Sequence, residues 1–128
     1  MKIIVSGATG LIGRHLLPAL RAHGATLAVL TRDTTRAHQQ LGLGGHPWDP
    51  LAEPAPRSAL DGADVVIHLA GEPVAGGRWN EGRKRLIRDS RVLGTRHLVE
   101  GIAAADPRPR VLLSASAVGY YGDREEIL

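Results

Sequence analysis

The chain has 128 residues, enough for one domain with one hydrophobic core. It contains no cysteine, which excludes disulfides, thiolate metal ligands and a cysteine nucleophile, so we expect no metal site and a reducing, cytoplasmic location. Lys and Arg number 16 against 13 Asp and Glu, a net charge of +3. Apart from one helical run between Arg83 and Arg96, the basic residues are spread along the chain, and no apolar run is long enough to span a bilayer. We therefore expect neither nucleic acid nor a membrane as a partner.

Apolar patterns predict alternating strands and helices along the whole chain. Pro18 lies inside the first helical pattern and removes a backbone donor there, and two glycines weaken the third strand. In chain order the expected elements are a strand at Lys2 to Ser6, a helix at Leu11 to His23, a strand at Thr26 to Thr31, a helix capped by Asp33 and running to about Leu41, a strand at Leu43 to Trp48, a helical turn at Ser58 to Leu60, a strand at Ala63 to Leu69, a helix from Trp79 to about Ala104, and a strand at Arg110 to Ala115.

This alternation is typical of α/β proteins, in which helices cover both faces of a parallel sheet. Right-handed crossovers leave few possible topologies for such a chain. We therefore predict a Rossmann-type, doubly wound parallel sheet with strand order 3-2-1-4-5.

A glycine-rich loop, GATGLIG, joins the first strand to the first helix. Gly7 permits the tight turn off the strand, Gly10 lets a pyrophosphate approach the backbone, and Gly13 allows close packing of the helix. The N–H groups and partial positive charge of the helix N-terminus would face the phosphates. The loop therefore predicts a dinucleotide site, whose contacts are Gly7, Thr9, Gly10, Leu11, Ile12 and Gly13.

The motifs SGATGLIG, HLAG and SASAVGYYG resemble those of the extended short-chain dehydrogenase/reductases. The stretch GEPVAGGRW with the following RKRLIRDSRVLGTRHLVE is similar to the atypical branch labelled NAD-dependent epimerase/dehydratase. The resemblance implies that the last helix packs close to the sheet at Gly94-Thr95. Members of that family are more than twice as long, so we expect residues 1–128 to be an incomplete NAD(P)-binding Rossmann domain, truncated after its fifth strand, with the C-terminal substrate-binding region absent.

The end of the second strand decides which dinucleotide is preferred. An acidic residue there bonds a ribose 2′-hydroxyl, whereas an Arg accommodates a 2′-phosphate. Thr31 stands where an NAD-preferring relative carries its carboxylate, and Arg32 follows it. Asp33 is the rival acid, but its simpler role is to cap the second helix. We therefore expect NADP as the cofactor, with NAD as the alternative.

Further cofactor contacts are expected at the ends of the third and fourth strands. The resemblance implies that Asp49 meets the adenine amino group, and an equally good interpretation is a turn residue before Pro50. Leu69, Ala70 and Gly71 are small or apolar residues suited to lie against the adenosine and phosphates. His68 is interpreted as a packed, hydrogen-bonded strand residue rather than a base.

In the resembled family a Ser or Thr after the fifth strand orients the substrate oxygen, and Ser116 matches that position. The Tyr and Lys pair that completes the site in that family is not found, because Tyr120 is followed four residues later by Arg124. Two interpretations remain: the cofactor-binding part of an epimerase/dehydratase-like oxidoreductase, or a non-catalytic dinucleotide-binding module acting as a sensor or interaction partner. We expect the chain alone to be inactive, and to form homo-oligomers through the exposed edge of its fifth strand.

Overall fold

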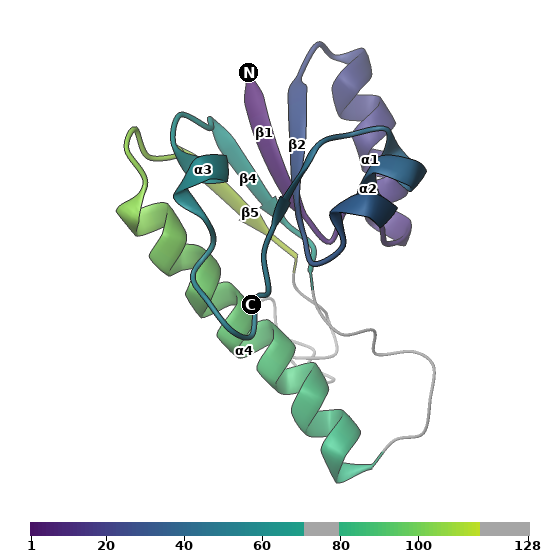
Figure 1. Ribbon diagram of the computed structural model, residues 1–128, viewed down its shortest axis with the longest axis vertical. Helices are drawn as coiled ribbons and strands as arrows, with labels where there is room; N and C mark the ends of the chain where they lie inside the picture. The colour runs from purple at the N-terminus through teal and green to yellow at the C-terminus, as the bar shows by residue number, and fades with distance from the viewer. Residues whose placement is uncertain (71–79, 116–128) are drawn as a thin grey trace, which may run out of the picture.

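The fold is described by a computed structural model that covers residues 1–70 and 80–115 (Figure 1). Strands and helices alternate throughout the described residues. In chain order they are β1 (Lys2–Ser6), α1 (Leu11–Ala22), β2 (Thr26–Thr31), α2 (Thr34–Leu41), β3 (Gly45–Pro47), α3 (Arg57–Leu60), β4 (Val65–His68), α4 (Glu81–Ala104) and β5 (Val111–Ser114).

The five strands form one parallel sheet in the order β3-β2-β1-β4-β5, which confirms the predicted topology. In the register of the sheet Ser6 lies opposite Leu30 on one side and His68 on the other. Because all strands point the same way, their carboxyl ends meet at one edge. Residues that follow β1, β2 and β4 are therefore brought together there.

Each face of the sheet packs against its own pair of helices, as Figure 1 shows. One face carries Ile4 and Val66 of neighbouring strands, in a cluster with Leu60 of α3 and Leu98 of α4. Each of these side chains is fully buried, which contributes about 1.5–3 kcal/mol apiece to the hydrophobic stabilisation.

The opposite face of the sheet packs against α1 and α2. Val5 and Ile67 alternate with the residues of the first cluster, and they contact a group that includes Leu17 of α1 and Ala37 of α2. The alternation of side chains along each strand is the reason why one sheet buries both faces.

The helix boundaries follow from capping residues. Asp33 caps α2 as predicted, because its carboxylate accepts a hydrogen bond from the Arg36 amide at 2.9 Å. Asn80 caps α4 in the same way, accepting from the Arg83 amide at 2.8 Å, so this helix begins after the predicted Trp79, which lies outside the described residues. Pro18 lies within α1, which continues past it.

The predicted strand at Leu43 to Trp48 is shorter in the structure, which has only Gly45–Pro47. Pro47 is tolerated here because β3 is an edge strand and the neighbouring Trp48 amide donates to the Thr31 carbonyl at 2.9 Å, so the missing N–H of Pro47 removes no bond to β2. The strands expected at Ala63 to Leu69 and Arg110 to Ala115 are also trimmed at their ends, to Val65–His68 and Val111–Ser114.

Candidate functional site

The glycine loop begins with Gly7, whose φ of +71° is a left-handed conformation that suits glycine. A Cβ at this position would lie 2.5 Å from the Ala70 nitrogen, so the loop passes directly against the residues that follow β4. The amide of Gly10 then donates to the Gly7 carbonyl at 3.2 Å, closing the turn before α1. This arrangement brings the backbone of the loop and of residue 70 into contact.

Gly13 and Gly10 have different surroundings. A Cβ on Gly13 would come within 2.6 Å of Ala8 Cα, so α1 packs against the loop at this point. A Cβ on Gly10 would meet only the Gly7 carbonyl oxygen, at 3.4 Å. Gly10 occupies the N-cap position of α1 and offers no side-chain cap to the amides of the first turn. An anion at that place would therefore find both space and hydrogen-bond donors.

A pocket of about 460 Å³ lies over the carboxyl edge of the sheet. It brings together seven of the residues predicted from the sequence to bind a cofactor. These are Gly7, Thr9, Gly10, Thr31, Arg32, Leu69 and Ala70. Gly71 and Ser116 lie outside the described residues. The pocket thus unites the ends of β1, β2 and β4, although these segments are far apart in the chain.

Other predicted contacts do not line this pocket. Leu11 and Ile12 are 67% and 61% exposed on the first turn of α1, and Gly13 is buried against Ala8. Asp49 is exposed, and its carboxylate accepts a hydrogen bond from the Leu51 amide at 3.1 Å. The structure therefore shows the turn role of Asp49, and its contact with adenine stays a prediction.

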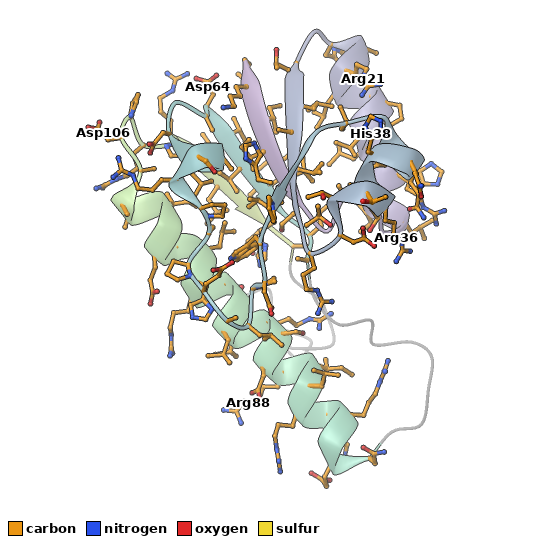
Figure 2. The ribbon with its side chains drawn as sticks, viewed as in Figure 1. Arg21, Arg36, His38, Asp64, Arg88 and Asp106 are labelled. Atoms are coloured by element: carbon orange, nitrogen blue, oxygen red, sulfur yellow. The ribbon has the colours of Figure 1, made fainter. Side chains whose placement is uncertain are left out.

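The polar side chains at and after the end of β2 differ in whether they are hydrogen-bonded within the turn or face the pocket. The Thr31 hydroxyl accepts a hydrogen bond from the Asp33 amide at 3.1 Å, and the Asp33 carboxylate caps α2. The exposed guanidinium groups of Arg32 and Arg36 remain as the cations of this part of the pocket. Figure 2 shows Arg36 on α2, on the side of the sheet opposite α4.

Arg36 was not predicted from the sequence. It follows Arg32 by four residues, with the capping Asp33 between them. A helix that begins at Thr34 places the residue of its first turn, three after the cap, near the end of the preceding strand. The position of Arg36, three residues after the capping Asp33, was therefore the signal in the sequence that could have identified it.

The wall opposite the glycine loop is formed by the segment after β3 and by α4. Trp48 is buried, and its indole N–H donates to the Glu53 carbonyl at 2.8 Å. His97 of α4 is hydrogen-bonded through Nδ1 to the Pro50 carbonyl at 2.5 Å, which ties this segment to the helix. Leu86 and Ser90, from the N-terminal half of α4, complete the lining. Figure 1 shows that this half of the helix extends past the carboxyl edge of the sheet.

Two buried polar side chains lie beneath the pocket floor. Ser6 Oγ and His68 Nδ1 are 2.6 Å apart, and the amides of Leu69 and Ala70 donate to the same oxygen at 3.2 and 3.3 Å. His68 Nε2 lies 3.3 Å from the Thr95 hydroxyl of α4. Burial lowers the pKa of His68 below its ordinary value. His68 is thus a packed, hydrogen-bonded strand residue, as predicted.

The resemblance placed the close approach of α4 at Gly94 and Thr95. Thr95 does reach β4 through His68, but a Cβ on Gly94 would face Pro50, at 3.4 Å. The tightest approach is at Gly101, where a Cβ would lie 2.5 Å from the Ala55 carbonyl oxygen. The glycines Gly94 and Gly101 of this helix therefore pack against the segment between β3 and α3, whereas Thr95 reaches the sheet.

A second hollow of about 650 Å³ lies along the surface of α4, lined by residues such as Val92, Thr95 and Val99. It is shallow and formed by one helix, and it contains no glycine loop or strand end. Among the described residues no group of His, Asp and Glu is placed to hold a metal, and no helix there is long and apolar enough to cross a membrane. The pocket at the carboxyl edge is therefore the candidate site.

The model of the NAD dependent epimerase/dehydratase family matches residues 3–128. The chain belongs to this family. It is 40% identical to the chloroplastic epimerase family protein SDR39U1 homolog of Arabidopsis thaliana, over 98% of this chain and 37% of that protein. It is 37% identical to the epimerase family protein YfhF of Bacillus subtilis, over 95% of this chain and 39% of the relative. The chain therefore spans less than two-fifths of the length of these epimerase family proteins.

Solved structures of similar proteins share the fold of this epimerase family chain. Human epimerase family protein SDR39U1 (isoform 2), solved with NADPH, superposes with a TM-score of 0.77 at 29% identity, covering 97% of this chain and 39% of that one. MoeE5 in complex with UDP-glucose and NAD superposes with a TM-score of 0.73 at 25% identity, covering 100% and 40% of the two chains.

Proposed function

We propose that residues 1–128 form the dinucleotide-binding domain of an NADP(H)-dependent epimerase/dehydratase-like oxidoreductase, working in the cytoplasm. The observation that carries the proposal is the pocket in which the glycine loop faces Arg32 and Arg36 across the end of β2. The NADPH in the structure of the human relative supports the choice of cofactor.

The residues of the pocket fit such a group. The pyrophosphate would lie against Gly10 and the first-turn amides of α1, where the absence of a side chain leaves room. The 2′-phosphate would lie between Arg32 and Arg36, and the bidentate geometry of a guanidinium suits a phosphate. Leu69 and Ala70 would provide an apolar wall with backbone groups beside the adenosine. A bound nicotinamide would supply hydride transfer, and Ser116 is proposed to orient the substrate oxygen.

Arginine substitutions test the proposal by calorimetric titration of NADPH and NADH. The parent chain is expected to bind NADPH more tightly, and Arg32→Ala should lose this preference through roughly ten- to hundredfold weaker NADPH binding, since a hydrogen bond to a charged group is worth about 1.5–3 kcal/mol. Arg36→Ala should act in the same direction. Arg21→Ala is the matched control, because Arg21 lies at the far end of α1 from the glycine loop (Figure 2). Equal affinities of the parent chain for the two dinucleotides would refute the preference.

We further propose that the chain forms homo-oligomers through the edge of β5. Among the strands of the described residues this one is last in the order of the sheet, and Val111 and Leu113 are 46% and 55% exposed on it. An unpaired edge with apolar side chains is a template for a second chain. Static light scattering at micromolar concentration is expected to show self-association that Leu113→Lys weakens, and a parent chain that stays monomeric would contradict this.

A further inference from the structure

The described core contains two buried polar side chains, Ser6 and His68, which are 0% and 4% exposed. They are register partners at the carboxyl ends of β1 and β4. The proposed binding of NADP(H) uses neither side chain directly. A buried polar pair at this position needs an explanation, because polar groups are buried at a cost unless their hydrogen bonds are satisfied.

The hydrogen bonds around Ser6 favour one tautomer of His68. Ser6 Oγ accepts from the Ala70 amide at 3.3 Å and, at 3.2 Å, from the Leu69 amide, which also donates to the Ser6 carbonyl oxygen at 3.0 Å, so both amides lie on the acceptor side of the hydroxyl. Its single proton is then available for His68 Nδ1, 2.6 Å away, so Nδ1 is the acceptor. The other ring nitrogen, Nε2, must carry the proton of the neutral imidazole and donate it to Thr95 Oγ1 at 3.3 Å.

This chain of hydrogen bonds connects three elements of the fold to the pocket. Leu69 and Ala70 line the pocket, and their amide groups are anchored on Ser6 at the end of β1. Ala70 also packs against Gly7, where an added Cβ would lie 2.5 Å from its nitrogen. Thr95 belongs to α4, which contributes Leu86 and Ser90 to the same pocket. A change at His68 would therefore move the backbone that faces the ligand.

We propose that Ser6, His68 and Thr95 form a positioning relay, in which His68 is the neutral Nε2–H tautomer and holds the backbone of Leu69 and Ala70 in place for the dinucleotide. This inference rests on the proposed function for its effect on binding. It goes beyond that function because it assigns a role to three residues that do not themselves touch the cofactor.

The surroundings of His68 suit a neutral imidazole. From β1 and α4 the groups that face it are the hydroxyls of Ser6 and Thr95, and the amide of Ala115, directly after β5, donates to its backbone carbonyl at 3.0 Å. Burial lowers the pKa of His68, which favours the neutral ring.

The first experiment examines the relay without any ligand. Nitrogen-15 NMR of the His68 ring is expected to show an unprotonated Nδ1 and a protonated Nε2, with the exposed His15, His23 and His38 as references in the same sample. Thr95→Val removes the acceptor at nearly constant shape and is expected to speed hydrogen exchange at the Leu69 and Ala70 amides. Thr95→Ser keeps the hydroxyl and should restore slow exchange. A protonated Nδ1, or unchanged exchange in Thr95→Val, would overturn the proposal.

The second experiment measures NADPH affinity by calorimetry. Thr95→Val is expected to weaken binding roughly two- to tenfold, the effect of about one hydrogen bond, whereas Thr95→Ser should bind like the parent chain. Asp64→Ala is the control for a loss of stability alone, because Asp64 accepts from the Lys2 amide at 2.7 Å at the opposite edge of the sheet (Figure 2). Equal weakening by Asp64→Ala and Thr95→Val would overturn the positioning role.

The two experiments separate this inference from the proposed function. A parent chain that fails to bind NADPH would refute the function, while the tautomer of His68 and the exchange of the Leu69 and Ala70 amides would still decide whether the relay exists. A chain that binds NADPH, with Thr95→Val binding equally well, would refute the relay's part in binding and leave the function intact.

Discussion

Gly7 lies so close to Ala70 that a Cβ added to the glycine would come within 2.5 Å of the Ala70 nitrogen. Gly7 also has a φ of +71°, which disfavours any other residue. Gly7→Ala is therefore expected to lower the free energy of unfolding by about 1–3 kcal/mol or more, through both strain and overpacking. Urea denaturation measures this loss.

Gly24→Ala is the matched control for the first prediction. Gly24 has a φ of +85°, but a Cβ there would meet nothing within 4 Å. It therefore carries the backbone strain without the contact. If Gly24→Ala destabilised the chain as much as Gly7→Ala, the contact with Ala70 would contribute nothing to the loss of unfolding free energy.

Gly10→Val is expected to abolish NADPH binding and to leave a folded chain. A Cβ at this position meets only the Gly7 carbonyl oxygen, at 3.4 Å, so the protein itself has room for it. The valine methyl groups would fill the space proposed for the pyrophosphate. Circular dichroism checks the fold and calorimetry checks binding; normal affinity of the variant would place the pyrophosphate elsewhere.

Substitution by alanine is expected to change the stability of the chain in opposite directions at Gly94 and Gly101, two glycines of α4. Gly101→Ala should destabilise the chain by about 1–3 kcal/mol, because its Cβ would lie 2.5 Å from the Ala55 carbonyl oxygen. Gly94→Ala should stabilise it by up to about 1 kcal/mol, since its Cβ would meet Pro50 at 3.4 Å and alanine favours the helix. Thermal unfolding distinguishes them, and shifts of the same sign would contradict the packing described for α4.

The alternation of strands and helices, with the right-handed crossover rule, predicted the order of the strands. The cap at Asp33 and the tight turn at Gly7 were predicted from residues next to one another in the chain. Arg36 and Gly101 were missed because their roles depend on which segment lies opposite them. A glycine inside a helix looks the same whether it faces solvent or, like Gly101, the backbone of Ala55.

The hydrogen-bond partners of His68 could not be predicted from the sequence for the same reason. Its place at the end of an apolar strand was enough to predict a buried, hydrogen-bonded side chain. Its partners Ser6 and Thr95 are 62 and 27 residues away in the chain. Only the register of β1 with β4 and the crossing of α4 bring them to the ring, so the sequence could not identify them.

The stability of the chain is expected to fall in mild acid. Burial lowers the pKa of His68 below the ordinary value of 6.5, and burial followed by the charge of Lys2 does the same for His46. Above 6.5 these rings are neutral in the folded and the unfolded chain, and their stabilisation is fully present. As the pH falls below 6.5 and through the lowered values, the unfolded chain binds protons that the folded chain does not, so stability is lost.

Urea denaturation at pH values on both sides of 6.5 measures this effect. His68→Gln should flatten the dependence on pH, because it removes the buried ring whose pKa is lowered. A free energy of unfolding that rises as the pH falls through this range would contradict the assignment of a neutral, buried imidazole.

The central claim is that a dinucleotide binds at the carboxyl edge of the sheet with its pyrophosphate on the glycine loop. Titrating NADPH into the nitrogen-15-labelled chain tests this most directly, by mapping which amide resonances move. The account predicts saturable shifts at Gly10, Arg32 and Ala70, which line the pocket, and none at Gly62 and Asp64, at the opposite end of the strands. Shifts confined to Gly62 and Asp64, or no saturable shift at the glycine loop, would contradict it.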